Sequence, residues 1–438
     1  MIELNERQTA KYLVQKIEEV LKEYDIALEQ VLTVTCDNGA NMLAAVKELD
    51  KHVQMITADK LFVDEDDFEN NDELFNDLIN ELSTKVSLIR CAVHTLQLAV
   101  TDAIKAVDNR IRSLTNVAKN CRKMSYKPSF DLKNIPLPPL YSRTRWGGIF
   151  EMISNFYDHE DFYRDLGKQF KELDLLENWG FIHDYKNAFQ PVYVATKEMQ
   201  GQHVSLGDFY IHWLRCMMHV KQQPRNDLTK ALGDSLEKRL HQLKKNLAFK
   251  AALLIDPRFN YISSVVLTPD EKAETRKFII STSKRIESLK PNQTTQQLKI
   301  PEQPTATSSL DDFMTSLFGG SPPAVLQSDS ENTFLKQLNA LDLETHQNYK
   351  YDIWKHWIAR KDSHPELSEI ALTIMTVPAT QVSVERAFSA LALVLSPART
   401  KLSVQNLASI LTIKLNEELL HEVIPKMSSC QKSKSKST

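Results

Sequence analysis

Only two stretches of the chain have the pattern of a buried β-strand, which limits the size of any sheet it can form. VLTVTCD (31–37) is a β-branched run ending at a carboxylate, and KVSLIRCAV (85–93) is a second apolar run. Apolar residues at helical spacing precede the first run, at 9–24, and follow it, at 41–49; the second run continues into helix from His94. The sequence therefore predicts one small α/β unit.

The remainder of the chain has a helical pattern. Apolar residues recur at helical spacing from Arg110 to about Lys290 and again from Asn332. Ten glycines in 438 residues are too few for a loop-rich β protein. Residues 290–332 are rich in Pro, Gln, Ser and Thr, which predicts a disordered linker. The basic tail 426–438 fits either a weak nuclear signal or a frayed terminus.

Several classes of protein are excluded by composition. The five cysteines are scattered and lack any C-x-x-C pair, so neither a disulfide framework nor a zinc knuckle is expected. No apolar run is long enough to span a membrane, and the N-terminus lacks the apolar core of a signal peptide. We therefore expect a protein of the cytosol or nucleus, with no membrane partner, no metal site and no cofactor.

Charge is unevenly distributed although the net charge is only -3. The segment 105–146 holds ten Lys or Arg residues against two Asp, a net charge of +8. The run DEDDFENNDE (64–73) is strongly acidic and has the composition of a solvated loop. The basic segment 105–146 is the candidate for a salt-sensitive nucleic-acid contact.

Two apolar stripes occur near the C-terminus. In the first, Val384, Ala387, Phe388, Leu391 and Leu395 share one helix face. In the second, Ser403 is a good N-cap for a helix that carries Val404, Leu407, Leu411 and Leu415. Both stripes must be buried, but periodicity alone does not decide between burial inside the fold and burial against a second copy.

The same region carries a resemblance to a known family. PATQVSVERAFS (378–389), followed by Arg399, Leu402, Leu411 and Leu415-Asn416, closely resembles the dimerisation region of hAT-superfamily transposases. The resemblance implies a homodimer whose contacts include Phe388, Leu391, Leu395, Leu407, Leu411 and Leu415. The family's Gly after F-S is replaced here by the run 390–393, which bears on the dimer geometry.

Further segments agree with the family in the expected order. TCDNGANM (35–42) looks like the segment with the second catalytic Asp, RCAVHTLQL (90–98) is similar to the C-x-x-H motif, and TRW (144–146) is similar to the R-W motif. IDPRF (255–259) resembles a recurrent segment of the helical insertion. The resemblance implies a ribonuclease-H-like core interrupted by a large all-helical insertion.

The resemblance also bears on whether the chain retains the family's catalytic acids. The family's sheet carries three acids, and Asp37 and Glu385 match the second and third. The strand with the first acid, and a zinc-binding DNA module, would lie before Met1, so we expect a non-catalytic protein in which both acids are vestigial. Without a catalytic role, Asp37 would cap a helix and Glu385 would occupy a favoured position at the start of a helix. The alternative is a truncated copy of an active transposase, which would use Mg²⁺ or Mn²⁺ for strand cleavage.

The remaining residues of the motifs have two interpretations each. Cys91 and His94 are expected beside the site, as a buried thiol and a hydrogen-bonded imidazole rather than metal ligands. Arg145 and Trp146 are expected at a DNA surface, where Trp146 would stack on an unpaired base, although a core position suits Trp146 equally well.

The predicted architecture is α/β plus α, in a nuclear protein. We predict a partial ribonuclease-H-like core at 1–150, a helical insertion at 151–289, a disordered linker at 290–332, a C-terminal dimerisation region that completes the core at 333–425, and a basic tail at 426–438.

Overall fold

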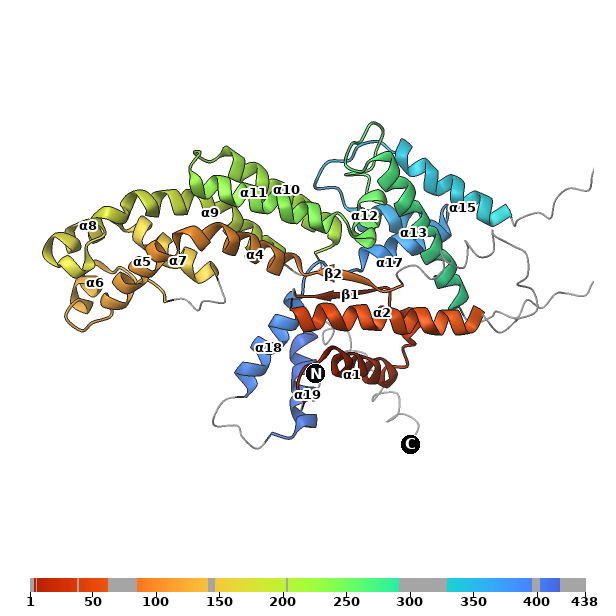
Figure 1. The fold of residues 1–438 in the computed structure, drawn as a ribbon, viewed down its shortest axis with the longest axis horizontal. Coiled ribbons are helices and arrows are strands. Elements are labelled where there is room, and N and C mark those ends of the chain that lie inside the picture. Colours follow the sequence, from red (N-terminus) through yellow and green to blue (C-terminus); the bar gives the residue numbers. More distant parts are fainter. Residues whose placement is uncertain are drawn as a thin grey trace, which may run out of the picture. The chain divides into compact units, whose positions relative to one another are not determined.

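The computed structural model describes residues 4, 6–37, 39–61, 85–140, 146–201, 204–290, 329–395 and 402–417. Helices make up most of them, and only two strands occur in this part of the chain. The chain divides into two compact units, which are described separately: unit 1 is Met1–Asn246 with Val377–Thr438, and unit 2 is Leu247–Thr376 (Figure 1).

Unit 1 begins with a small α/β arrangement. Strands β1 (Thr33–Cys36) and β2 (Ser87–Arg90) pair in parallel, with Cys36 opposite Arg90. Parallel pairing requires a crossover between the strands, and α2 (Ala40–Leu61) lies within it. Before β1 the chain forms α1 (Ala10–Glu23) and the 3₁₀ turn η1 (Leu28–Gln30).

The core of this part lies between α1, α2 and the strand pair. Its buried residues come from one face of α1, one face of α2 and the strand pair with its flanks: Leu13, Val14, Cys36, Ala45, Val46, Leu49, Val53 and Val86. The Asp50 carboxylate of α2 accepts hydrogen bonds from the backbone N–H groups of Lys85 and Val86, both at 2.7 Å. Asp50 thereby fixes where β2 begins.

The rest of unit 1 up to Asn246 is helical. Its elements are α4 (Ala92–Ile104), η3 (Lys105–Val107), α5 (Asp108–Asn120), α6 (Lys127–Lys133), α7 (Trp146–Asp158), α8 (Glu160–Gln169), η4 (Lys171–Leu173), η5 (Leu176–Asn178), α9 (Trp179–Met199), α10 (Leu206–Gln222) and α11 (Asp227–Leu243). The long helix α9 packs against α7 and α10, and α11 packs against α4 (Figure 1). The interior is rich in aromatic side chains: Phe130, Phe156, Tyr163, Tyr185, Phe189, Phe209 and Trp213.

Unit 1 also contains two helices that lie far along the sequence from the rest of the unit. They are α18 (Val382–Val394) and α19 (Val404–Leu415), and they pack against each other (Figure 1). The Ser403 hydroxyl accepts a hydrogen bond from the backbone N–H of Asn406 at 3.2 Å. The predicted N-cap is therefore confirmed.

Unit 2 is a separate helical body. It consists of α12 (Leu247–Leu254), α13 (Pro269–Ser288), α15 (Asp329–Ala340), η6 (Leu341–Leu343), α16 (Ile353–Ala359) and α17 (Pro365–Met375). The Trp357 indole is buried and donates to the Ile255 carbonyl at 3.2 Å. Within the IDPRF segment, the buried Arg258 guanidinium contacts the Asp256 carboxylate at 2.7 Å, so each of these buried charges has a partner of opposite sign.

The helix-rich character predicted from the sequence is confirmed, as is the presence of only two strands in the part of the chain described. The ribonuclease-H-like identity of the core and the predicted domain boundaries stay predictions. Helix α15 begins at Asp329, inside the predicted linker, whereas residues 291–328 and the basic tail lie outside the described residues. No helix of the described part is long and apolar enough to cross a membrane. Its four cysteines are free: Cys36, Cys91, Cys121 and Cys216.

Candidate functional site

The carboxyl ends of the two strands place Asp37 and Cys91 side by side. Each follows the last residue of its strand, and in parallel strands these ends share one edge of the sheet. The Cys91 N–H donates to the Cys36 carbonyl at 2.8 Å, which continues the ladder by one bond. We call Asp37, Cys91 and Glu385 the strand-end site.

The segment 378–381 runs along this edge and leads into α18. The Thr35 hydroxyl donates to the Pro378 carbonyl at 2.7 Å, and the Ala92 N–H donates to the Ala379 carbonyl at 2.9 Å. The Gln381 side-chain amide donates to the Thr35 carbonyl at 3.0 Å. These bonds join β1 and the start of α4 to a segment more than 280 positions further along the chain.

Asp37 is held by a local turn. One of its carboxylate oxygens accepts a hydrogen bond from the Gly39 N–H at 2.9 Å, immediately before α2 begins. This is the arrangement of an Asx turn that caps a helix, which is the structural, non-catalytic role considered for Asp37. Asp37 is half-buried, and its carboxylate contributes to raising the pKa of the adjacent Cys36 thiol to about 11, although burial is the larger cause.

Glu385 comes to the same edge from α18. It lies in the first turn of that helix, where a carboxylate is favoured by the partial positive charge of the unpaired N–H groups. Gln381, one helical turn before Glu385, is bonded to β1, so the start of α18 lies at the strand ends. The structure thus brings Asp37 and the first turn of α18 to one edge of the sheet, whereas a joint role of the two carboxylates stays a prediction.

Cys91 is a buried thiol, and His94 lies next to it in the first turn of α4. The Gln381 N–H donates to the Cys91 sulfur at 3.4 Å. Burial raises the pKa of Cys91 above its ordinary value, and the Glu385 carboxylate adds to the rise, while the N–H groups of His94 and Gln381 oppose it. A thiol of this kind stays protonated at neutral pH and is a weak nucleophile.

The strand-end site does not assemble a metal-binding set from the described residues. No group of three or more His, Cys, Asp or Glu side chains in that part of the chain is arranged to hold a metal ion. Two-metal phosphoryl chemistry needs several oxygen ligands around each cation, and two carboxylates seldom suffice.

Trp146 belongs to the aromatic core, whereas Arg145 lies outside the described residues. Trp146 is the first residue of α7, and its side chain is only 5% exposed. Its ring centroid lies 6.2 Å from that of Phe150, 6.3 Å from Tyr193 and 6.5 Å from Phe189. This packing corresponds to the core alternative for Trp146; its stacking on a DNA base stays a prediction.

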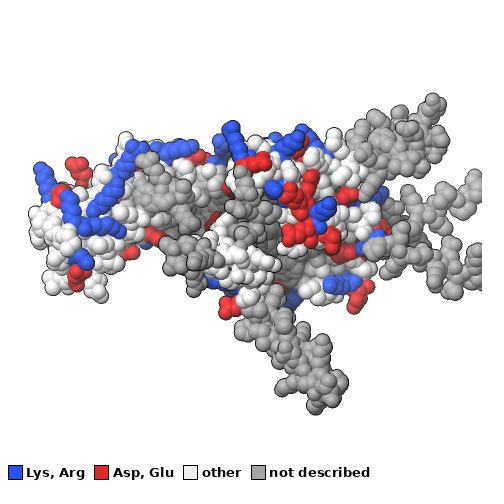
Figure 2. All heavy atoms as spheres, turned by 90° about the horizontal axis from the view of Figure 1, so that it is seen from below, with Lys and Arg blue, Asp and Glu red and all other residues white. Residues whose placement is uncertain are grey.

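The basic segment 105–146 is partly neutralised by neighbouring acids. Lys105 pairs with Asp102 at 3.0 Å, and Lys123 pairs with Glu172 at 2.7 Å. Lys119 and Lys127 are exposed and belong to no ion pair of the described part. Figure 2 shows Lys and Arg side chains, with fewer acidic ones, over the left part of its view, where Figure 1 draws α5 to α8.

The C-terminal helices leave much of their apolar surface exposed. Leu411 is only 4% exposed because α18 and α19 pack against each other, and Leu391 and Leu407 are half-buried. In contrast, Phe388 is 56% exposed. The other exposed apolar side chains on these helices are Val384, Leu393, Leu395, Ile410, Ile413 and Leu415. Apolar residues gathered in this way on a surface mark an interaction site.

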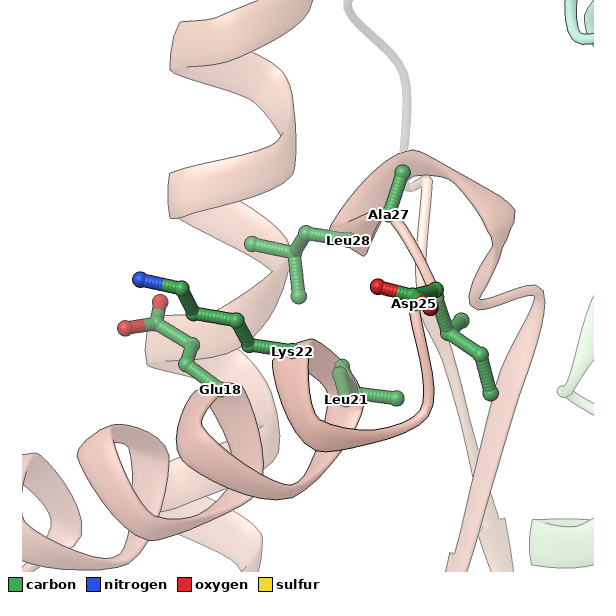
Figure 3. A pocket seen from close by; sticks show the side chains of 7 residues that line it. Glu18, Leu21, Lys22, Asp25, Ala27 and Leu28 are labelled. Atoms are coloured by element: carbon green, nitrogen blue, oxygen red, sulfur yellow. The ribbon is translucent and has the colours of Figure 1, made fainter.

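A small open hollow of about 320 Å³ lies at the end of α1. Figure 3 shows Glu18 and Lys22 on α1 and Asp25 on the turn that follows. Glu18 already contacts the His52 ring at 2.9 Å, so this carboxylate has a partner inside unit 1. We assign no chemistry to this hollow.

Comparison with known proteins identifies one matching family region and one similar protein. Residues 331–417 match the hAT family C-terminal dimerisation region, and together with the sequence motifs this match supports a relationship to hAT-superfamily transposases. It is also similar to the zinc finger BED domain-containing protein 4 of Homo sapiens, with 20% identity over 354 residues. That match covers 76% of this chain, and the chain spans about 30% of the length of this relative.

Sequence reasoning missed the contacts of three residues that attach α18 and the segment before it to the rest of unit 1. Thr35 and Gln381 bind the segment before α18 to the sheet, and the Arg386 guanidinium donates to the Gln200 carbonyl at the end of α9, at 2.8 Å. Gln381 and Arg386 lie inside the recognised C-terminal motif. The signal was therefore present, but the partners are so distant in sequence that spacing could not reveal them.

Proposed function

We propose that this chain is a non-catalytic, hAT transposase-derived nuclear protein that forms a homodimer through α18 and α19 and contacts nucleic acid through segment 105–146. The observation that carries the dimer is the exposed apolar surface of these two helices, because it falls inside the residues that match the family's dimerisation region. Removing about 100 Å² of apolar surface from water yields roughly 2–3 kcal/mol. A second copy would supply that burial.

Light scattering at micromolar concentration tests the homodimer. The wild-type chain should have twice the mass of one chain, and Phe388→Asp should shift it toward the monomer because a charge would enter the contact. Leu132→Asp is the matched control, since Leu132 is 84% exposed on α6 and outside the proposed contact. A wild-type chain that remains monomeric at these concentrations contradicts the proposal.

Salt-dependent binding to a DNA duplex tests the nucleic-acid contact. Lys119→Ala with Lys127→Ala should reduce affinity and make its salt dependence shallower, because fewer phosphates would be neutralised. Lys230→Ala with Lys238→Ala removes the same charge from exposed positions on α11 and should have little effect. Arg145→Ala should likewise reduce the affinity for DNA. Trp146 is kept, since removing a buried Trp would cost about 3–5 kcal/mol of stability.

A second function is favoured by one observation: Asp37 directly follows β1, and the segment that leads to Glu385 is bonded to the same strand. A longer version of this protein with a third acid could cleave DNA strands with Mg²⁺ or Mn²⁺. Manganese-dependent nicking of a plasmid by an N-terminally extended version, lost on Asp37→Ala and retained on Asp362→Ala, would establish this function. Under the main proposal no nicking above background is expected.

Nuclear localisation is tested by imaging a fluorescent fusion of the chain in cells. Accumulation in the nucleus agrees with the proposal. Even distribution between cytosol and nucleus, or exclusion from the nucleus, contradicts it.

A further inference from the structure

Unit 2 contains an open hollow of about 580 Å³ beside α16. One wall is the loop 348–351, and the other is the face of α16 and its flanks that presents Asp352, Lys355, His356, Ala359 and Arg360. We call it the α16 hollow. Its volume suits a small molecule or one unit of a polymer, because ligand sites commonly measure about 300–1,000 Å³.

The lining of the α16 hollow is predominantly cationic. It includes Lys350, Lys355 and Arg360 against one carboxylate, that of Asp352. Lys355 lies 3.4 Å from Asp352, and this pair is largely exposed, so it holds the ammonium group only weakly. Arg360 is engaged by Glu344 at 2.6 Å. The two lysines therefore supply most of the charge that is open to a ligand.

Neutral polar groups line the same hollow. The Asn348 side-chain oxygen accepts from the Lys350 N–H at 2.9 Å, which fixes the loop and keeps this oxygen occupied. The Tyr351 hydroxyl lies 3.0 Å from Nδ1 of the buried His356. These contacts order the loop wall of the hollow before any ligand arrives.

His356 is the buried polar group of the hollow. Its Nε2 has no hydrogen-bond partner among the described residues, which is rare for a buried nitrogen. Burial and the nearby Arg360 charge lower the pKa of His356 to about 4. The ring is therefore neutral at pH 7, and one of its two nitrogens carries a hydrogen. An unpartnered nitrogen of this kind indicates a place prepared for a ligand or a water molecule.

We propose that the α16 hollow binds the phosphate of a nucleotide, free or within a strand, through Lys350 and Lys355, with the sugar or base against Tyr351. Two ammonium groups beside a tyrosine ring match the alternation of charge and flat apolar surface in a nucleotide. The site lies in unit 2, outside segment 105–146, and goes beyond the proposed function. It does not require the dimer.

Calorimetric titration of the full chain with three probes tests this site: inorganic phosphate, adenosine monophosphate and a short oligodeoxythymidine strand. Lys350→Glu with Lys355→Glu should weaken binding by about tenfold or more, because two charge-assisted contacts become repulsive. Lys336→Glu with Lys361→Glu makes the same change in net charge at exposed positions that do not line the hollow, and should stay within about twofold of the wild type.

The three probes separate the sources of the phosphate. Binding of adenosine monophosphate that depends on Lys350 and Lys355 supports a free nucleotide, and binding of the strand alone supports a phosphate within a polymer. Equal loss in both double variants, or no binding of any probe by the wild type, overturns the proposal. Lys350→Gln with Lys355→Gln repeats the test if the charge reversal alters thermal unfolding. The Lys119 and Lys127 variants should keep nucleotide binding, which distinguishes this site from the proposed contact of segment 105–146.

Discussion

The orientation of Asp37 depends on the absence of a side chain at residue 39. A Cβ atom at Gly39 would lie 2.9 Å from the Asp37 carboxylate oxygen that now accepts the Gly39 N–H. We predict that Gly39→Ala displaces this carboxylate and destabilises unit 1 by about 0.5–2 kcal/mol, the usual cost of losing a helix cap. Urea unfolding followed by circular dichroism measures the change.

Gly147 provides the control for this substitution. It lies inside α7, and a Cβ added there would meet no atom within 4 Å. Gly147→Ala should therefore be neutral or stabilising by up to about 1 kcal/mol, because alanine favours helix. If Gly39→Ala were as well tolerated as Gly147→Ala, the role given to the Asp37 turn would be wrong.

His356 makes the stability of unit 2 depend on pH. Its folded pKa of about 4 lies below the ordinary value near 6.5, so the unfolded chain binds the proton more tightly. The stabilisation is complete above about pH 6.5 and is lost as pH falls toward 4, by up to about 3 kcal/mol. Thermal melts should show this loss for the wild type and a smaller one for His356→Gln. The same substitution at the exposed His346 should leave the pH dependence unchanged.

Single residues were predictable from the sequence where a motif names them, and not where their role depends on distant contacts. The motifs singled out Asp37, Cys91 and Glu385, and the structure places Asp37 and Cys91 directly after the strands and Glu385 in the first turn of α18. The bonds of Thr35 and Gln381 could not be foreseen, because they join strand β1 to a segment hundreds of residues away. For Trp146, the sequence left two alternatives that only packing could compare.

At the scale of elements, the strands are shorter than the apolar runs that predict them. The runs cover 31–37 and 85–93, but the ladder covers only Thr33–Cys36 and Ser87–Arg90. The difference arises at the ends, where Asp37 turns the chain toward α2 and Cys91 precedes the first turn of α4. Apolar runs do not distinguish a strand from the buried start of the next helix.

The attachment of α18 to the sheet is an element-scale property that can be tested. We predict that Thr35→Val, which keeps the shape of the side chain but removes its hydrogen bond to Pro378, loosens the start of α18. Hydrogen exchange over residues 382–388 should accelerate several-fold. Thr33→Val makes the same change on the same strand at a position whose hydroxyl forms no such bond in the described structure, and should leave this exchange unchanged. Equal acceleration in both variants would show that the strand, rather than the bond, is responsible.

At the scale of the whole molecule, unit 2 is one continuous stretch between two parts of unit 1. Residues 247–376 contain a core of their own around Leu253, Ile255, Trp357, Ile370 and Ile374. A domain with its own core can fold when it is excised. The fragment 247–376 should therefore show helical circular dichroism and a cooperative thermal transition, and a fragment without such a transition would contradict its independence.

The same fragment separates the two parts of the matched dimerisation region. Residues 331–417 extend across α15, α16 and α17 in unit 2 and α18 and α19 in unit 1, but the exposed apolar stripe with Phe388 belongs only to the last two helices. If that stripe forms the homodimer, the fragment 247–376 should remain monomeric in light scattering at concentrations where the full chain is dimeric. A dimeric fragment would instead move the contact to unit 2, and Phe388→Asp in the full chain would then leave the dimer intact.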